Sequence, residues 1–96
     1  MSPSDGPARA ATRRLLIVNE RGLHARAAAK FVATAGSFTS EITVDKDGTS
    51  VSGRSIMGLM MLAAGPGSTI SVSAAGSDAG AALDALATLV GNRFDE

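Results

Sequence analysis

Residues 15–36 read LLIVNERGLHARAAAKFVATAG, an apolar run followed by a break and then a helical pattern. The run Leu15–Val18 includes two β-branched residues and suits a buried strand. Arg21-Gly22 interrupts it, and Gly36 is a suitable C-terminal cap for a helix between the two glycines. The apolar residues of that helix recur at helical spacing: Ala25, Ala28, Val32 and Ala35, with Phe31 beside them. This stretch predicts a strand joined to a helix by a short loop.

The next segment changes from helical to strand periodicity. Residues 38–45 alternate between apolar and polar, which predicts a strand with one wet face. Asp47-Gly48 favours a tight turn, so residues 49–52 should return as its hairpin partner. Ser55 can cap a short helix over residues 56–62.

A final strand and helix complete the predicted fold. Residues 69–74 alternate again, and Ser77 is a suitable N-cap for an amphipathic helix that ends at Gly91-Asn92. The order β-α-β-β-α-β-α predicts an α+β sandwich with a mostly antiparallel sheet covered on one face. Residues 1–12 are rich in small residues and proline and predict a flexible tail, so the single domain spans 13–96.

Composition narrows the possible functions. The 96 residues carry nine basic and nine acidic side chains. This balance argues against a protein that binds along a nucleic-acid backbone and against a polybasic protein that binds a membrane surface. The chain has no Cys, which excludes disulfides and thiolate chemistry and favours the cytoplasm. A chain with one His and no Cys lacks the ligands of the common zinc sites, and we expect neither metal nor bound cofactor.

That single histidine, His24, falls where the first helix begins, with Arg26 two residues further on. The first turn of a helix carries unpaired N–H groups and a partial positive charge, so it favours an anion. His24 offers a nucleophilic nitrogen, and the planar fork of Arg26 suits a phosphoryl group. We expect the small side chains at residues 25 and 27–29 to leave this end open to a partner.

Spacing alone does not choose among the roles open to these residues. A lone His at a helix start is by default a hydrogen-bonding cap or a solvated side chain, and Arg26 is by default a surface charge. The residues by themselves therefore indicate a candidate anion site.

The motif from Gly22 to Arg26, GLHAR, followed by Ala28-Ala29, resembles the active-site signature of HPr, the histidine-containing phosphocarrier of the bacterial phosphotransferase system. A second motif, SIMGLM at residues 55–60, resembles that family's regulatory serine and the short helix after it. The distance between the motifs and the predicted order of elements both fit the family. The resemblance covers about residues 13–91.

The resemblance implies a specific route for a phosphoryl group. His24 would accept it on Nδ1 from the phosphohistidine of enzyme I, which is charged by phosphoenolpyruvate, and would pass it to an enzyme IIA-type protein. Arg26 would stabilise the phosphate, and Ser55 matches a serine that a dedicated kinase phosphorylates in part of the family. The implied fold is an open-faced sandwich of a four-stranded antiparallel sheet with three helices on one face. We expect a monomeric carrier more than a stand-alone enzyme.

One position departs from the family pattern, because Ala27 stands where the family usually has Pro after the Arg. Ala should keep the helix and add one free amide near the phosphate. The Ala-rich start followed by Lys30-Phe31-Val32 looks more like the nitrogen-related branch, in which a phosphorelay regulates.

The short helix after Ser55 predicts a docking surface. It cannot bury every side: Leu59 and Leu62 suit the core, whereas Ile56, Met57 and Met60, together with Ala25, suit a partner. Asp95 and Glu96 are interpreted as solubilising charge. Two alternatives remain open here. One is a regulatory binding module of the same fold controlled by Ser55 phosphorylation, and the other is a small-ligand sensor domain.

Overall fold

Seven regular elements make up the computed structural model, which describes residues 10–96. In chain order they are β1 (Ala10–Leu16), α1 (Ala25–Ala35), β2 (Glu41–Lys46), β3 (Thr49–Ser52), α2 (Ile56–Met61), β4 (Thr69–Ala75) and α3 (Ala79–Gly91). A short turn, η2 (Arg93–Asp95), follows α3. This order confirms the predicted β-α-β-β-α-β-α fold.

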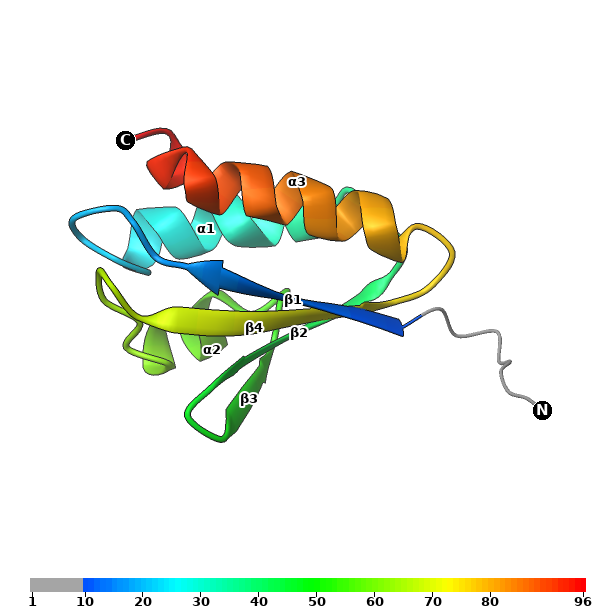
Figure 1. Cartoon of the computed structure of the whole chain (residues 1–96), viewed down its shortest axis with the longest axis horizontal. Helices are drawn as coiled ribbons and strands as arrows, with labels where there is room; N and C mark the ends of the chain where they lie inside the picture. Colours follow the sequence, from blue (N-terminus) through cyan, green and yellow to red (C-terminus); the bar gives the residue numbers. More distant parts are fainter. Residues whose placement is uncertain (1–9) are drawn as a thin grey trace.

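The strands form one antiparallel sheet in the order β1-β4-β2-β3. Helices α1 and α3 lie side by side over one face of that sheet, and α2 packs against α1 and β3 (Figure 1). The end of the chain lies at the same end of the molecule as the loop between β1 and α1 (Figure 1). This arrangement brings residues from both ends of the sequence to one site.

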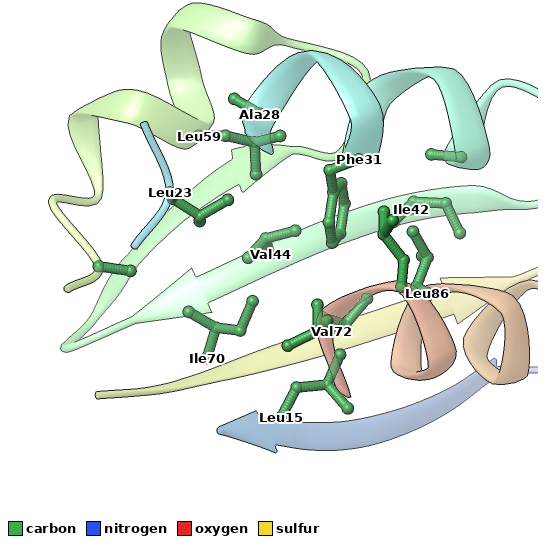
Figure 2. Close-up of a cluster of buried hydrophobic side chains, with 14 of the residues drawn as sticks. Leu15, Leu23, Ala28, Phe31, Ile42, Val44, Leu59, Ile70, Val72 and Leu86 are labelled. Atoms are coloured by element: carbon green, nitrogen blue, oxygen red, sulfur yellow. The ribbon is translucent and has the colours of Figure 1, made fainter. Parts of the chain in front are cut away.

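The core between the helices and the sheet is almost entirely aliphatic, because the chain has only three aromatic residues, all Phe. Alternate residues of β2 and β4 turn their side chains toward Phe31 of α1 and Leu86 of α3 (Figure 2). The strand residues are Ile42, Val44, Ile70 and Val72, all buried. Leu59 of α2 is buried too and lies close to Ala28 of α1 (Figure 2). Burial of Ala27, Ala28 and Phe31 fixes the position of the N-terminal half of α1.

The first strand lies earlier in the sequence than its apolar run predicts. β1 begins at Ala10, which pairs with Ala75, and it ends at Leu16, whose side chain is exposed. The ladder is made by backbone groups, so residues 10–14 join it although their side chains are exposed. Residues 10–12, predicted as the end of a tail, therefore belong to the sheet, and residues 1–9 of that predicted tail lie outside the described residues.

The start of α3 also differs from the prediction, since Asp78 and not Ser77 occupies the N-cap position. The Asp78 carboxylate makes no cap bond to its own helix. It accepts hydrogen bonds from the backbone N–H groups of Thr39, at 2.9 Å, and Ser40, at 3.0 Å, and from both hydroxyls. These bonds, led by that from the Ser40 hydroxyl, lower the pKa of Asp78 to about 2. The competing partners lie on the segment that enters β2, which sequence spacing does not reveal.

Within residues 10–96, no helix combines the length and the apolar character needed to cross a bilayer.

Candidate functional site at the start of α1

Two loops meet beneath the start of α1. Gly22 has a φ of +65°, and a Cβ at this position would lie 2.3 Å from the carbonyl oxygen of Ala64. The next residue, Leu23, donates its backbone N–H to that same oxygen at 2.9 Å. Only glycine permits both the left-handed backbone and the close approach. The loop before α1 is therefore fastened to the loop between α2 and β4.

His24 occupies the N-cap position of α1, as predicted, and its backbone is extended. Its side chain makes no cap bond, and the first helical hydrogen bond runs from Ala28 N–H to His24 C=O at 2.8 Å. The N–H groups of Ala25, Arg26 and Ala27 have no acceptor among residues 10–96. An uncapped helix start of this kind favours an anion beside His24.

The imidazole of His24 is held by Glu96. Its Nε2 is hydrogen-bonded to Glu96 Oε2, and only 15% of the His24 side chain is exposed. Its Nδ1 has no hydrogen-bond partner among the described residues. The prediction that Glu96 is only solubilising charge is wrong, because the turn after α3 carries this carboxylate back to the start of α1.

A buried asparagine completes the support of Glu96. Asn19 Nδ2 donates to Gly22 C=O at 2.8 Å and to Glu96 Oε1 at 3.3 Å, whereas Asn19 Oδ1 is buried without a partner in residues 10–96. The hydrogen bond from His24 lowers the pKa of the Glu96 carboxyl, and Asn19 and the charge of Arg21 act in the same direction. Glu96 therefore stays ionised at neutral pH.

A shallow open depression of about 260 Å³ lies beside His24. Its lining comes from both loops: Arg21, Leu23, His24, Ala63, Ala64 and Gly65. Arg26 is exposed, and its guanidinium makes no hydrogen bond or ion pair with another described residue. It is therefore free to turn toward an anion at the start of α1.

The alanines of α1 divide between two roles. Ala25 and Ala29 are exposed, in agreement with the prediction of an open helix end. Ala27 and Ala28 are fully buried in the core, so they do not contribute to the open helix end as expected, whereas burial of Ala28 agrees with its place in the apolar pattern of the helix. Small side chains at these two positions allow α1 to pack closely.

Ser55 is the N-cap of α2, as predicted, and its Oγ accepts a hydrogen bond from Gly58 N–H at 2.9 Å. Leu59 and Leu62 are buried as expected, and the predicted docking residues Ile56, Met57 and Met60 are exposed. Met61, which the sequence interpretation did not assign to the surface, is 78% exposed. No group of three or more potential metal-ligating side chains occurs in the described part of the chain.

Comparison with known proteins identifies the family. The family model described as "PTS HPr component phosphorylation site" matches residues 11–92. The chain belongs to the HPr phosphocarrier family. The phosphocarrier protein HPr of Cupriavidus necator is 50% identical over 80 residues, which cover 83% of this chain and 90% of that protein. Phosphoryl transfer is thus the family function, and the resemblance seen in the sequence is confirmed.

Solved HPr structures confirm the fold. The crystal structure of HPr from Thermoanaerobacter tengcongensis superposes with a TM-score of 0.86 at 43% identity, covering 90% of this chain and 97% of that one. Relatives of both branches match to a similar degree, since the phosphocarrier protein NPr of Shewanella violacea is 46% identical over 84 residues, 88% of this chain and 92% of its own. Assignment to the nitrogen-related branch stays a prediction.

Sequence reasoning missed three residues of this site: Asn19, Arg21 and Glu96. Asn19 directly follows an apolar run, and this position, which suggests burial of a polar side chain, is the only sign of its role in the sequence. Glu96 is 72 residues from His24, and no short motif connects positions so far apart. The family match itself ends at residue 92, before Glu96.

Proposed function

We propose that His24 is the phosphoryl acceptor of this HPr-family protein. Its Nδ1 takes the phosphoryl group from the phosphohistidine of enzyme I, charged by phosphoenolpyruvate, and passes it to a histidine of an enzyme IIA-type protein. We further propose that the exchange takes place in the cytoplasm and that the carrier acts as a monomer.

The uncapped start of α1 carries this proposal. His24 is the only histidine of the chain, and three first-turn N–H groups beside it lack acceptors among residues 10–96. A phosphoryl group on Nδ1 brings two or more anionic oxygens to those donors, where the helix dipole stabilises negative charge. The family's usual Pro would remove one donor, and Ala27 supplies it.

Arg26 supports the proposal from the solvent side. It lies in the same first turn and has no competing partner in the described chain. A guanidinium forms paired, charge-assisted hydrogen bonds with phosphate oxygens. We therefore assign Arg26 to stabilising the phosphoryl group during transfer.

An apolar surface next to the site supports transient docking. Met57 is 73% exposed, and Ile56 and Met60 are also exposed on the helix that leads to the loop lining the depression beside His24. Flexible thioethers accommodate more than one partner surface, as a carrier between two proteins requires. We assign these residues and Ala25 to docking, and Ser55 to regulation by a kinase such as the family's HPr serine kinase/phosphorylase.

The test is transfer from enzyme I. The purified chain is incubated with enzyme I and radiolabelled phosphoenolpyruvate, and the label is followed by its acid lability and by mass spectrometry. We expect one acid-labile phosphoryl group on the wild type and none on His24→Ala. Thr88→Ala, which changes an exposed residue of α3, is the matched control and should be labelled at the wild-type rate.

Labelling of His24→Ala at the wild-type rate would refute the assignment of the acceptor. A wild type that enzyme I does not label, but that a serine kinase with ATP labels in an acid-stable form lost in Ser55→Ala, would instead favour the regulatory binding module controlled by Ser55.

A further inference from the structure

The contact between Glu96 and His24 is part of a built arrangement. Both oxygens of the Glu96 carboxylate are engaged, Oε2 with His24 Nε2 and Oε1 with Asn19 Nδ2. The two side chains are partly shielded from water, with 15% of the His24 side chain and 21% of the Glu96 side chain exposed. A carboxylate held at two points presents a fixed acceptor to the imidazole.

The turn that delivers Glu96 is anchored on α1. Arg93, Phe94 and Asp95 have φ angles of 59°, 55° and 62°, all in the left-handed region. The Phe94 side chain is fully buried, and its carbonyl accepts a hydrogen bond from Lys30 Nζ at 2.8 Å. Glu96 N–H closes the turn on Arg93 C=O at 3.0 Å.

Three consecutive non-glycine residues in this region are unfavourable, at about 1–2 kcal/mol each for L-residues. Such a conformation persists only where the surroundings impose it, and here burial of Phe94 and the bond to Lys30 do so. The position of Glu96 is therefore imposed by the core and by α1, and it does not depend on the hydrogen bond to His24 alone.

We propose that Glu96 is a positioning residue that directs phosphorylation of His24 to Nδ1. Its carboxylate occupies Nε2, so the proton of the neutral ring resides there and the lone pair on Nδ1 is the only one available. This inference rests on the proposed role of His24 as acceptor. It extends that role by naming what decides between the two ring nitrogens.

The step balances without another reactant. The Nδ1 lone pair of neutral His24 forms a bond to phosphorus as the N–P bond of the donor breaks, and the donor ring leaves with the electron pair of that bond. The proton on Nε2 stays between His24 and Glu96. The positive charge that His24 acquires faces the Glu96 carboxylate, which stabilises the charged ring.

The test uses phosphoramidate, a small chemical phosphoryl donor that needs no partner protein. The full chain is treated with it, and the isomer formed at His24 is identified by 31P and 15N NMR. We expect the wild type to give the Nδ1 isomer and Glu96→Ala to give the Nε2 isomer in addition. We also expect Glu96→Ala to accept phosphoryl groups from phospho-enzyme I about tenfold more slowly, because a charge-assisted hydrogen bond is lost.

Two further variants separate the contact from its charge. Glu96→Gln keeps an oxygen acceptor for the Nε2 proton, so it should retain the Nδ1 isomer while transfer from phospho-enzyme I is slowed. Asp95→Asn removes the charge of the neighbouring exposed carboxylate, keeps a side chain that tolerates the left-handed backbone at this position, and should match the wild type in both measurements. A structural loss of the turn would not reproduce this pattern, because Glu96→Gln would then behave as Glu96→Ala does.

Two results would overturn the inference. One is the Nδ1 isomer alone from Glu96→Ala, at any rate of transfer, because Nε2 would then be excluded without Glu96. The other is faster phosphorylation of Glu96→Ala at Nδ1, which would make Glu96 a cover over the site. Failure of the proposed function is distinguishable, since it would appear as wild-type protein that enzyme I does not label at His24, whatever isomer phosphoramidate gives.

Discussion

The N-termini of α1 and α2 differ in whether their first-turn N–H groups have a hydrogen-bond acceptor. At α2 the Ser55 hydroxyl accepts the Gly58 N–H, so the helix satisfies its own donor. At α1 the side chain of His24 turns away to Glu96 and leaves three N–H groups without an acceptor in the described chain. The two helices meet in the core, yet one start is closed and the other is open.

The difference shows how similar sequence positions acquire different functions. An anion arriving at α1 finds free donors, whereas a phosphate on Ser55 has to replace a cap that already exists. The open start gives up cap stabilisation, typically about 1 kcal/mol, and gains a place for a phosphoryl group. The five predictions below test how these helix starts, and that of α3, are stabilised and what charge does at each.

The largest effect is expected from Gly22→Ala, which disrupts the contact between the two loops beneath the start of α1. The added Cβ meets Ala64 C=O and the backbone would remain left-handed, so we expect a loss of about 2–4 kcal/mol in the free energy of unfolding. Denaturant unfolding measures it. Gly65→Ala, in the loop opposite, is the matched control: its Cβ would meet nothing within 4 Å, and stability should change by less than about 0.5 kcal/mol. Equal losses of stability in the two variants would show that the close contact of Gly22 with Ala64 is not what the substitution disrupts.

Arg26→Ala should slow phosphotransfer at the start of α1 without destabilising the fold. The side chain is exposed, so stability should stay within about 0.5 kcal/mol of the wild type. A lost charge-assisted contact of about 1.5–3 kcal/mol should slow phosphotransfer roughly tenfold to hundredfold. Rapid-quench kinetics at saturating phospho-enzyme I measure the change, and Arg26→Lys should recover part of the rate. Unchanged kinetics in Arg26→Ala would mean that the backbone N–H groups suffice.

At the start of α2, changes to Ser55 should alter the stability of the protein. Ser55→Ala removes the cap and should cost about 1 kcal/mol, whereas Ser55→Asp keeps an acceptor for Gly58 N–H and should preserve the melting temperature. Calorimetry of the three proteins distinguishes these outcomes. A similar loss in both variants would show that packing, and not capping, holds the start of α2.

The same pair of variants tests Ser55 as a brake. A negative charge beside the docking residues should slow association with enzyme I if the partner surface is acidic, and higher ionic strength should restore part of the rate. Stopped-flow comparison across a salt series shows it. Indistinguishable curves for wild type, Ser55→Asp and Ser55→Ala would leave Ser55 as a cap alone.

The smallest effect is expected from lowering the pH below about 4, which acts on Asp78 at the start of α3. Asp78 has its pKa lowered to about 2 in the folded protein from an ordinary 3.8, so its contribution to stability is present above about pH 4 and is lost as the pH falls toward 2. Asp78→Asn cannot ionise and should lack this part of the acid dependence. Melting temperatures of both proteins between pH 5 and pH 2 test it, and parallel curves would contradict the assignment.

The elements that sequence predicted well are those whose signals are local. Alternation located β2 and β4, and the caps Ser55 and Gly36 bounded helices within a residue or two, because short-range side-chain chemistry determines these features. His24 and Arg26 were found because they lie in one turn of helix, and the family motif specified their chemistry. The roles of these two residues and of Ser55 stay predictions.

The parts that sequence missed depend on contacts across the fold. Asp78 bonds to Thr39 and Ser40, and Glu96 reaches His24, through partners 38 or more positions away. The extent of β1 was missed for a different reason. Its outer residues pair through backbone groups that every residue carries, so apolar patterning gives no information about them.

Pairing of β1 with β4 also bears on when the protein becomes competent. Thr12 and Ser73, whose hydroxyls lie 3.0 Å apart across these strands, are separated by 61 positions in the chain. A nascent chain that has emerged only through β3 carries His24 but lacks Ala64, the residue to which the loop before α1 is fastened. Closure of so long a loop is slow relative to local helix formation. His24 is thus synthesised early in translation, but the site around it forms only after β4 has inserted between β1 and β2.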